Sequence, residues 1–418
     1  MAVRLQFEGI RCFAEPQDAV VRPLTLLVGE NSSGKSTFLA LCRIASAVVE
    51  GLDTPFSFNE PPFLLGAYDQ IASYQRGRAG HAKSFSITAR VSGVAHSGLI
   101  RAEFVSRNGQ PALNRWGLIA GGLSVQIVSD NSPEQVTLVV ESARGKKEVV
   151  ETRPWVIWDL INRPLGSLTG LPEYAFLGTL FSESDLESLR KAADSIRKEF
   201  GPLTYALAPI RTSPRRTYDP VFAEAEPEGS HVPMALAVLS DSEWANLRPE
   251  LKEFGSKSGL FEQIEVIRKG KKESDPFQIG VKSGGSTFNL VDVGYGVSQA
   301  LPILVDTLQR HEAFLIQQPE VHLHPRAQAE MGSFFARQAG KNRRFVIETH
   351  SDHLVDRIRM EVRAGTLRSD DVSLLYFERQ KHGATIHNVE LDEDGNITNP
   401  PSGYRQFFLN EERDLLGV

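Results

Sequence analysis

The sequence predicts an α/β fold with a mixed sheet and flanking helices, and three stretches of the chain carry this prediction. Residues 24–28 form an apolar run that leads into a glycine-rich loop and then an apolar helical stretch, the strand–loop–helix order of α/β proteins. Strand-like and helix-like segments alternate over residues 293–378. Residues 84–128 alternate apolar and polar side chains, as half-buried β-strands do. We therefore expect a core split in sequence, with roughly 200 residues inserted between its two halves.

The composition of the 418-residue chain is that of a globular protein, with 41% hydrophobic and 23% charged residues. The net charge of −6 means that any nucleic-acid contact would need a local basic patch. Its two cysteines, Cys12 and Cys42, stand in apolar surroundings, which favours packing over a disulfide and fits a reducing compartment. No apolar run approaches the roughly 20 residues that span a bilayer. We expect a soluble, cytoplasmic protein without a membrane partner.

Three regions are expected along the chain. Residues 1–150 form an N-terminal lobe with the glycine-rich loop and a β-rich subdomain. Residues 151–275 form an inserted, largely helical region with one core strand near 203–210, and they include an amphipathic helix at 182–200. Residues 276–418 form a C-terminal lobe, which contains the later strand and helix alternation.

The first glycine-rich loop has the spacing G-x-x-x-x-G-K-S, which is typical of phosphate binding. Gly29 and Gly34 let the backbone curl so that successive N–H groups point inward, toward an anion that also faces a helix N-terminus. Lys35 can reach the β- and γ-phosphates, and the Ser36 hydroxyl can bind Mg²⁺. The sequence therefore predicts a nucleoside triphosphate site formed by Gly29, Glu30, Asn31, Ser32, Ser33, Gly34, Lys35, Ser36 and Thr37.

A second glycine-rich segment, residues 292–300, precedes another apolar helix. Glycines, a serine and a helix N-terminus together favour a second anion-binding end, with Ser298 as its polar group. The alternative is a glycine-rich helix cap in which Ser298 satisfies the first turn.

Two apolar strands end in polar residues. Residues 313–316 lead into Gln317, Gln318 and Glu320, and residues 344–347 lead into Glu348 and His350. Open α/β sheets bind ligands outside the carboxyl ends of their strands, so these side chains are candidates for one site. His350 is suitably placed to contact a γ-phosphate.

Together these motifs resemble the ABC-type AAA ATPases, a group related to SMC and RecF proteins and to the ATPase part of overcoming-lysogenization-defect nucleases. The motifs are G-E-N-S-S-G-K-S-T at 29–37, G-Y-G-V-S-Q at 294–299, P-E-V-H-L-H-P at 319–325 and E-T-H-S-D-H at 348–353. The resemblance implies an ABC-type P-loop ATPase head, with ATP and Mg²⁺ as cofactors. It also implies a dimer in which Ser298 of one subunit closes on the γ-phosphate held by the other. Gln70, in the G-A-Y-D-Q segment, would serve as the Q-loop.

The chain departs from this family where two acids are expected at the end of the Walker B strand, just before a proline. Gln317 and Gln318 occupy the positions of the Mg²⁺ ligand and the catalytic glutamate. Glutamine cannot act as a general base, although its amide oxygen can hydrogen-bond a metal-bound water. Catalysis is therefore expected of Glu320 or Glu348, with His350 and Gln318, while Ser36 and Gln317 serve the metal. For Glu320, a surface or helix-capping acid is an equally good interpretation.

By resemblance, the chain is expected to be an ATP-binding and ATP-hydrolysing switch that controls a separately encoded effector in anti-phage defence. It would act as a homodimer or a higher homo-oligomer. A first alternative is a weakly hydrolysing or non-hydrolysing scaffold that ATP stabilises and that sequesters a toxic partner, which the two glutamines favour. A second alternative is a RecF- or SMC-like DNA-repair ATPase, with DNA as a partner.

Several other groupings are weaker signals. The histidines of residues 322–353, with nearby acids, have feasible zinc spacings, but the motifs explain them without zinc. The acidic run 390–395 is better interpreted as a hairpin turn than as a nuclease site. The basic residues of 211–216 and 269–272 would suit nucleic acid or phosphate, although such runs are more often solvated loops.

Overall fold

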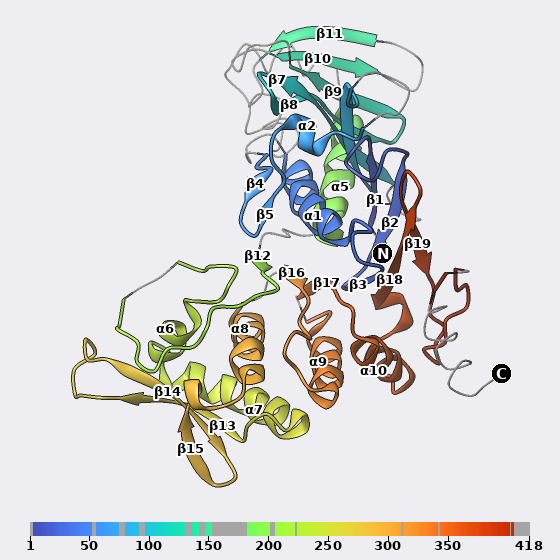
Figure 1. The fold of residues 1–418 in the computed structure, drawn as a ribbon. Coiled ribbons are helices and arrows are strands. Elements are labelled where there is room, and N and C mark those ends of the chain that lie inside the picture. Colours follow the sequence, from blue (N-terminus) through green and yellow to red (C-terminus); the bar gives the residue numbers. More distant parts are fainter. Residues whose placement is uncertain are drawn as a thin grey trace, which may run out of the picture. The chain divides into compact units, whose positions relative to one another are not determined.

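The computed structural model has a mixed α/β architecture, which confirms the predicted fold class (Figure 1). It describes residues 3–51, 56–74, 80–91, 97–129, 136–141, 147–152, 182–200, 205–221, 224–310, 313–341, 343–401 and 403–404. The chain divides into two compact units. The first comprises Met1–Arg22, Glu30–Leu203 and Phe377–Asn388, and the second Pro23–Gly29, Thr204–Tyr376 and Val389–Val418. The three-region division stays a prediction, and residues 153–181 of its middle region lie outside the described part.

The first unit contains an antiparallel sheet of eight strands in the order β11-β10-β9-β8-β7-β6-β1-β2. Along β1, buried and exposed positions alternate, because successive side chains of a strand point to opposite faces. The strands are β1 (Val3–Glu8), β2 (Gln17–Val21), β6 (Ser84–Val91), β7 (Gly98–Arg107), β8 (Gln110–Ala120), β9 (Leu123–Val128), β10 (Val136–Glu141) and β11 (Lys147–Thr152). The unit also contains β4 (Asn59–Glu60), β5 (Phe63–Leu64) and α2 (Tyr68–Ile71).

Two helices pack on this sheet. The amphipathic helix expected at 182–200 is confirmed as α5 (Glu183–Phe200), and its apolar stripe packs on β6, β7 and β8. The other helix, α1 (Lys35–Glu50), contacts β6, β7 and α5. The indole Nε1 of Trp116 on β8 donates a hydrogen bond to the main-chain oxygen of Val48 at 3.0 Å. The helix that follows the glycine-rich loop is therefore fixed against a buried sheet.

The apolar residues on the two sides of Pro23 do not form one continuous strand. The chain forms two strands there, β2 and β3 (Leu24–Gly29), which join different sheets. Pro23 stands between them and has no N–H to contribute to a ladder, so a strand does not run through it. β2 instead pairs with β1, and the side chain of Asn388 on β19 (Gly383–Val389) donates to the main-chain oxygen of Asp18 at 2.9 Å.

A six-stranded sheet has the order β12-β16-β17-β3-β18-β19, and its first four strands are parallel. They are β12 (Tyr205–Leu207), β16 (Ala313–Gln317), β17 (Arg344–Glu348) and β3, followed by β18 (Val372–Gln380). The parallel strands are almost wholly apolar and buried, as strands covered on both faces must be. Their carboxyl ends share one edge, where Leu27 pairs with Glu348 and Glu348 pairs with Gln317.

Helices of the second unit lie beside one another in Figure 1, among them α8 (Tyr295–Gln309), α9 (Pro325–Gln338) and α10 (Asp352–Arg363). Helix α7 (Asp241–Ser258) packs on α8 and α9 and begins with a capping box between Ser240 and Glu243. The unit also holds α6 (Val232–Ala237), the short helices η2 (Leu290–Asp292) and η3 (Ser369–Asp371), and an antiparallel sheet of β13 (Gln263–Arg268), β14 (Phe277–Ser283) and β15 (Ser286–Asn289). Of the helices that the structure describes, none is long and apolar enough to cross a lipid bilayer.

Four phenylalanines pack around the first turn of α1. The Phe38 ring makes edge-to-face contacts with Phe7 and Phe377, each with ring centroids 5.4 Å apart, and Phe13 packs against Phe7 and Phe377. We predict that Phe38→Ala lowers the free energy of unfolding by about 3–5 kcal/mol, because it removes a fully buried ring and leaves a cavity. Urea denaturation checks this value, with Phe38→Leu expected to cost less. A loss below about 1 kcal/mol would contradict the packing described here.

Candidate functional site

The glycine-rich loop has the backbone conformation that a phosphate cradle needs. Gly29, Ser32 and Gly34 have φ angles of 137°, 60° and 99°, and Gly34 is the N-cap of α1. Left-handed residues within a turn direct successive N–H groups toward one point, where an anion can be held. At Gly34 no side chain fits, since an added Cβ would lie 2.6 Å from Cys12 Sγ.

Lys35 is the first residue of α1 and directly follows the loop that it was predicted to serve. Its side chain is only 3% exposed, and its Nζ donates to the main-chain oxygen of Glu30 at 2.6 Å. The Ser33 hydroxyl donates to the same oxygen at 2.7 Å. A buried ammonium group and a left-handed cradle fit a bound phosphate group, so the residues present suit the predicted nucleotide.

Arg11 connects this loop to the predicted Q-loop. It follows β1 with a φ of 43°, and its Nη1 donates to Thr37 Oγ1 at 3.4 Å. Its Nε donates to the main-chain oxygen of Gln70 at 3.1 Å, while the Gln70 side chain accepts from the Ala67 N–H. Burial lowers the pKa of Arg11. The first unit thus brings Gln70 and Thr37 together through an arginine that sequence analysis missed. Its only signal in the sequence was a basic residue in an otherwise uncharged stretch soon after a strand.

The second unit brings Gln317, Gln318 and Glu348 together at the carboxyl ends of β16 and β17. Gln317 lies opposite Glu348 in the parallel register, and Glu348 is buried. Gln318 adopts a left-handed conformation with φ of 43°, and its N–H donates to the main-chain oxygen of Glu348 at 2.8 Å. The polar strand ends therefore meet at one edge, as expected for parallel strands.

Glu320 is a buried acceptor, so its interpretation as a surface or helix-capping acid is wrong. Its carboxylate accepts hydrogen bonds from Thr349 Oγ1 at 2.8 Å and from the His350 N–H at 2.6 Å. Burial raises the pKa of Glu320, and these two donors oppose that shift. The cap of α9 is His324 instead. Glu320 therefore fixes the turn after β17, where the imidazole of His350 is exposed, and its catalytic role stays a prediction.

Ser298 lies in the first turn of α8 and does not cap that helix. The N-cap residue is Gly294, and the Ser298 hydroxyl donates to the main-chain oxygen of Tyr295 at 2.8 Å. The next residue, Gln299, is paired with the main chain of Arg211. Arg211 in turn donates from Nη2 to the main-chain oxygen of Gln317 at 3.1 Å. The signature helix is thus connected to the end of β16 within one unit.

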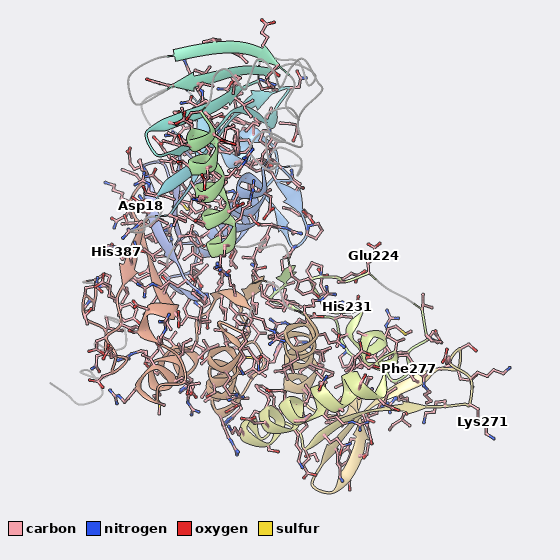
Figure 2. The ribbon with its side chains drawn as sticks, turned by 180° about the vertical axis from the view of Figure 1, so that it is seen from behind. Asp18, Glu224, His231, Lys271, Phe277 and His387 are labelled. Atoms are coloured by element: carbon pink, nitrogen blue, oxygen red, sulfur yellow. The ribbon has the colours of Figure 1, made fainter. Side chains whose placement is uncertain are left out.

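The predicted basic runs differ in their surroundings. Arg211 is buried, so the interpretation of this residue as part of a solvated loop is wrong. Arg216 is exposed and donates to Asp292 from Nη1 at 2.9 Å. Lys271 lies at the outer end of the β13–β14 hairpin, where it is exposed (Figure 2). Among the residues that the structure describes, no group of three or more His, Cys, Asp or Glu side chains is arranged to hold a metal ion.

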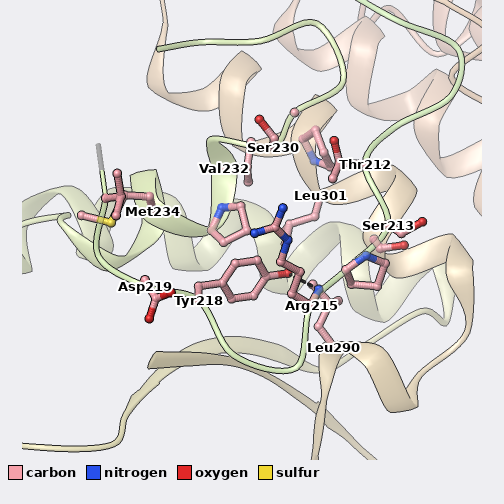
Figure 3. A pocket seen from close by; sticks show the side chains of 16 residues that line it. Thr212, Ser213, Arg215, Tyr218, Asp219, Ser230, Val232, Met234, Leu290 and Leu301 are labelled. Atoms are coloured by element: carbon pink, nitrogen blue, oxygen red, sulfur yellow. Dashed lines mark hydrogen bonds between the residues drawn. The ribbon is translucent and has the colours of Figure 1, made fainter. Parts of the chain in front are cut away.

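A cavity of about 290 Å³ lies between the loop that follows Arg211 and helix α8 (Figure 3). Within the loop, the Arg215 N–H donates to the Tyr218 hydroxyl at 2.9 Å. Pro302 of α8 has no N–H, so the Ser298 carbonyl lacks its usual helical donor. The lining includes Val232, Leu290, Leu301 and Pro302 as apolar groups and Ser213, Arg215, Asp219, Ser230 and Ser298 as polar groups.

Two parts of the chain are similar to known protein families. Residues 172–356 match the family described as "AAA domain, putative AbiEii toxin, Type IV TA system". Residues 367–416 match a family described as a protein of unknown function (DUF3696). No curated protein matches the chain.

Several solved structures show low similarity to this chain. The SMC head bound to the C-winged helix domain of ScpA is 11% identical, with 93% of this chain and 98% of that chain covered and a TM-score of 0.42. The SMC head domain from Thermotoga maritima is 10% identical, with 93% and 99% covered and a TM-score of 0.40. The Smc head domain with an extended coiled coil, bound to the C-terminal domain of ScpA derived from Pyrococcus furiosus, is 10% identical, with 99% and 98% covered and a TM-score of 0.42.

The segment matched by the AAA family contains α8, β16 and β17, the elements that carry three of the four motifs on which the resemblance was based. Over residues 172–356 the chain is therefore similar to this AAA domain, and the predicted resemblance to the ABC-type AAA ATPases is confirmed.

Proposed function

We propose that this protein is an ATP-binding and ATP-hydrolysing switch that closes as a homodimer around nucleotide. Closure would control an effector protein that is encoded separately, in anti-phage defence. The observation that carries the proposal is the loop of residues 29–37, in which left-handed backbone and the buried Lys35 suit the phosphates of a nucleotide. The AAA family match supports ATP as that nucleotide.

Each of the predicted site residues would have its own role. Lys35 and the loop N–H groups bind the phosphates, and Ser36 and Gln317 are the groups proposed to hold Mg²⁺. This ion, when bound, would neutralise charge on the phosphate oxygens. Ser298 of a second copy closes over the γ-phosphate, and His350 responds to it. Closure follows if the closed state binds ATP more tightly than the open state does.

Hydrolysis is expected to be slow. Gln317 and Gln318 cannot accept a proton, and Glu320 already accepts two hydrogen bonds. The same observation favours a second candidate, a scaffold that ATP stabilises without being consumed. In that case the closed dimer would persist and sequester its partner.

Steady-state ATP turnover, measured beside ATP binding and with or without DNA, separates these functions. The switch predicts slow turnover that DNA does not change. Tight ATP binding without any turnover would contradict the hydrolysing switch and favour the scaffold. Turnover that DNA stimulates would contradict the scaffold and favour a DNA-repair ATPase.

Gly34→Ala is expected to weaken ATP binding at least tenfold, on the order of 1.4 kcal/mol. The added methyl group meets Cys12 and Phe13, and the left-handed φ is strained for alanine, so the loop must shift. Titration with a fluorescent ATP analogue measures the effect. Gly80→Ala is the matched control, because Gly80 also has a positive φ but an added Cβ there has no described residue within 4 Å beyond its chain neighbours. Equal affinities for the two variants would contradict the role assigned to this packing.

A further inference from the structure

Arg211 is a buried cation that the fold leaves partly without hydrogen bonds. Its side chain is 2% exposed, and Nη2 donates to Gln317. Among the residues that the structure describes, none offers an acceptor to the buried Nε and Nη1 atoms. Burial lowers the pKa of Arg211 to about 10, so the group still carries its proton at neutral pH. Buried donors without acceptors are rare in native proteins, which points to an acceptor that reaches them in another state of the protein.

Glu320 is the charged group best suited to be that acceptor. It is the charge that raises the pKa of Arg211 against the effect of burial. In the structure its two oxygens accept from Thr349 and His350 instead. A charged guanidinium is a stronger donor to a carboxylate than a neutral hydroxyl or amide, so Glu320 can exchange one set of donors for another. Two sets of donors can therefore bind the Glu320 carboxylate. One set is the Thr349 hydroxyl and the His350 N–H, and the other is the Nε and Nη1 groups of Arg211.

The main chain of Arg211 is fixed to the signature helix by two hydrogen bonds. Its N–H donates to Gln299 Oε1 at 3.2 Å, and its main-chain oxygen accepts from Gln299 Nε2 at 3.4 Å. Gln299 directly follows Ser298 in the first turns of α8. Any displacement of this end of α8 is therefore carried to Arg211, and from there to the surroundings of Glu320.

We propose that Arg211 is a positioning residue that takes over the carboxylate of Glu320 when α8 moves on dimer closure. The His350 N–H is then released from Glu320. This inference rests on the proposed function, because it requires nucleotide binding and closure. The exchange would change the hydrogen bonding of His350 at the end of β17 when Ser298 binds a γ-phosphate. Ser298 and His350 are more than fifty residues apart in the sequence. Such an exchange is a two-state element of the kind that coupling between sites requires.

Hydrogen exchange of the His350 amide, resolved by fragmentation mass spectrometry on the full chain, tests the proposal without depending on hydrolysis. In the wild type, saturating ATP and Mg²⁺ are expected to speed exchange of this amide about tenfold or more, because its hydrogen bond to Glu320 is lost. In Arg211→Gln, ATP still binds but the His350 exchange rate stays as in the nucleotide-free protein. Gln299→Met, which removes both hydrogen bonds to Arg211, is expected to behave the same way.

Arg343→Gln is the matched control. Arg343 is also a buried arginine, but its guanidinium donates to Arg310, Gln338 and Leu308, so its loss is structural only. This variant should lose stability and keep the ATP effect at His350. The proposal is overturned if ATP-bound wild type shows unchanged His350 exchange, or if Arg211→Gln and Gln299→Met keep the full change. If Arg211→Gln does not fold, the His350 exchange rate of Gln299→Met with and without ATP tests the proposal by itself. A wild type that binds no ATP would instead refute the proposed function.

Discussion

Lys35→Ala is expected to weaken ATP binding by on the order of 100-fold or more, since charge-assisted hydrogen bonds to phosphate are among the strongest polar contacts in proteins. Lys35 is buried at the start of α1, and its ammonium group donates a hydrogen bond to the main-chain oxygen of Glu30. Alanine removes the only cation among residues 29–37. Equilibrium titration with a fluorescent ATP analogue measures the loss.

Two controls make this result specific. Lys83→Ala removes an exposed lysine from the same unit and should leave the ATP affinity unchanged. Thermal unfolding without nucleotide should show that Lys35→Ala remains folded. Wild-type affinity in the folded Lys35→Ala variant would mean that nucleotide binds elsewhere, and the loop would lose its proposed role.

The double substitution Gln317→Asp with Gln318→Glu is expected to raise ATP turnover by about 10²-fold or more, the usual contribution of a placed general base. The change restores a metal-binding acid and a proton acceptor at the end of β16. It also places a new carboxylate beside Glu348, because Gln317 and Glu348 are neighbours in the parallel register. The variant should therefore unfold at lower temperature in EDTA and recover stability with Mg²⁺.

The control for this gain is Gln309→Glu, which adds an acid at the exposed end of α8 and should not change turnover. Single Gln318→Glu should give part of the increase. If the double variant binds ATP with wild-type affinity but gains no turnover, the glutamines do not limit hydrolysis. The catalytic roles predicted for Glu320, Glu348 and His350 would then have to be tested one by one.

Local patterns made much of the fold predictable. The phosphate loop follows from glycines and a lysine within nine residues, and α5 follows from apolar spacing along one helix. Pro23 is a local signal too, since a residue without an N–H divides a strand.

The contacts that complete the site could not be predicted, because they join residues far apart in the chain. Arg11 and Thr37 are 26 residues apart, and Arg211 and Gln317 are 106 residues apart. The burial of Glu320 depends on where β17 lies beside β16, which a single sequence does not specify. The same holds for the left-handed backbone of Gln318, which tertiary packing imposes on an ordinary residue.

The molar mass of the protein in solution, measured by light scattering with and without ATP and Mg²⁺, tests most directly whether nucleotide joins two copies. We expect the mass to rise from that of one chain, 46.2 kDa, to twice that value when ATP is added. Ser298→Arg should prevent the increase while ATP still binds, because it fills the signature end of α8 with a bulky side chain. ATP bound to a protein that keeps the mass of one chain would contradict the shared nucleotide site.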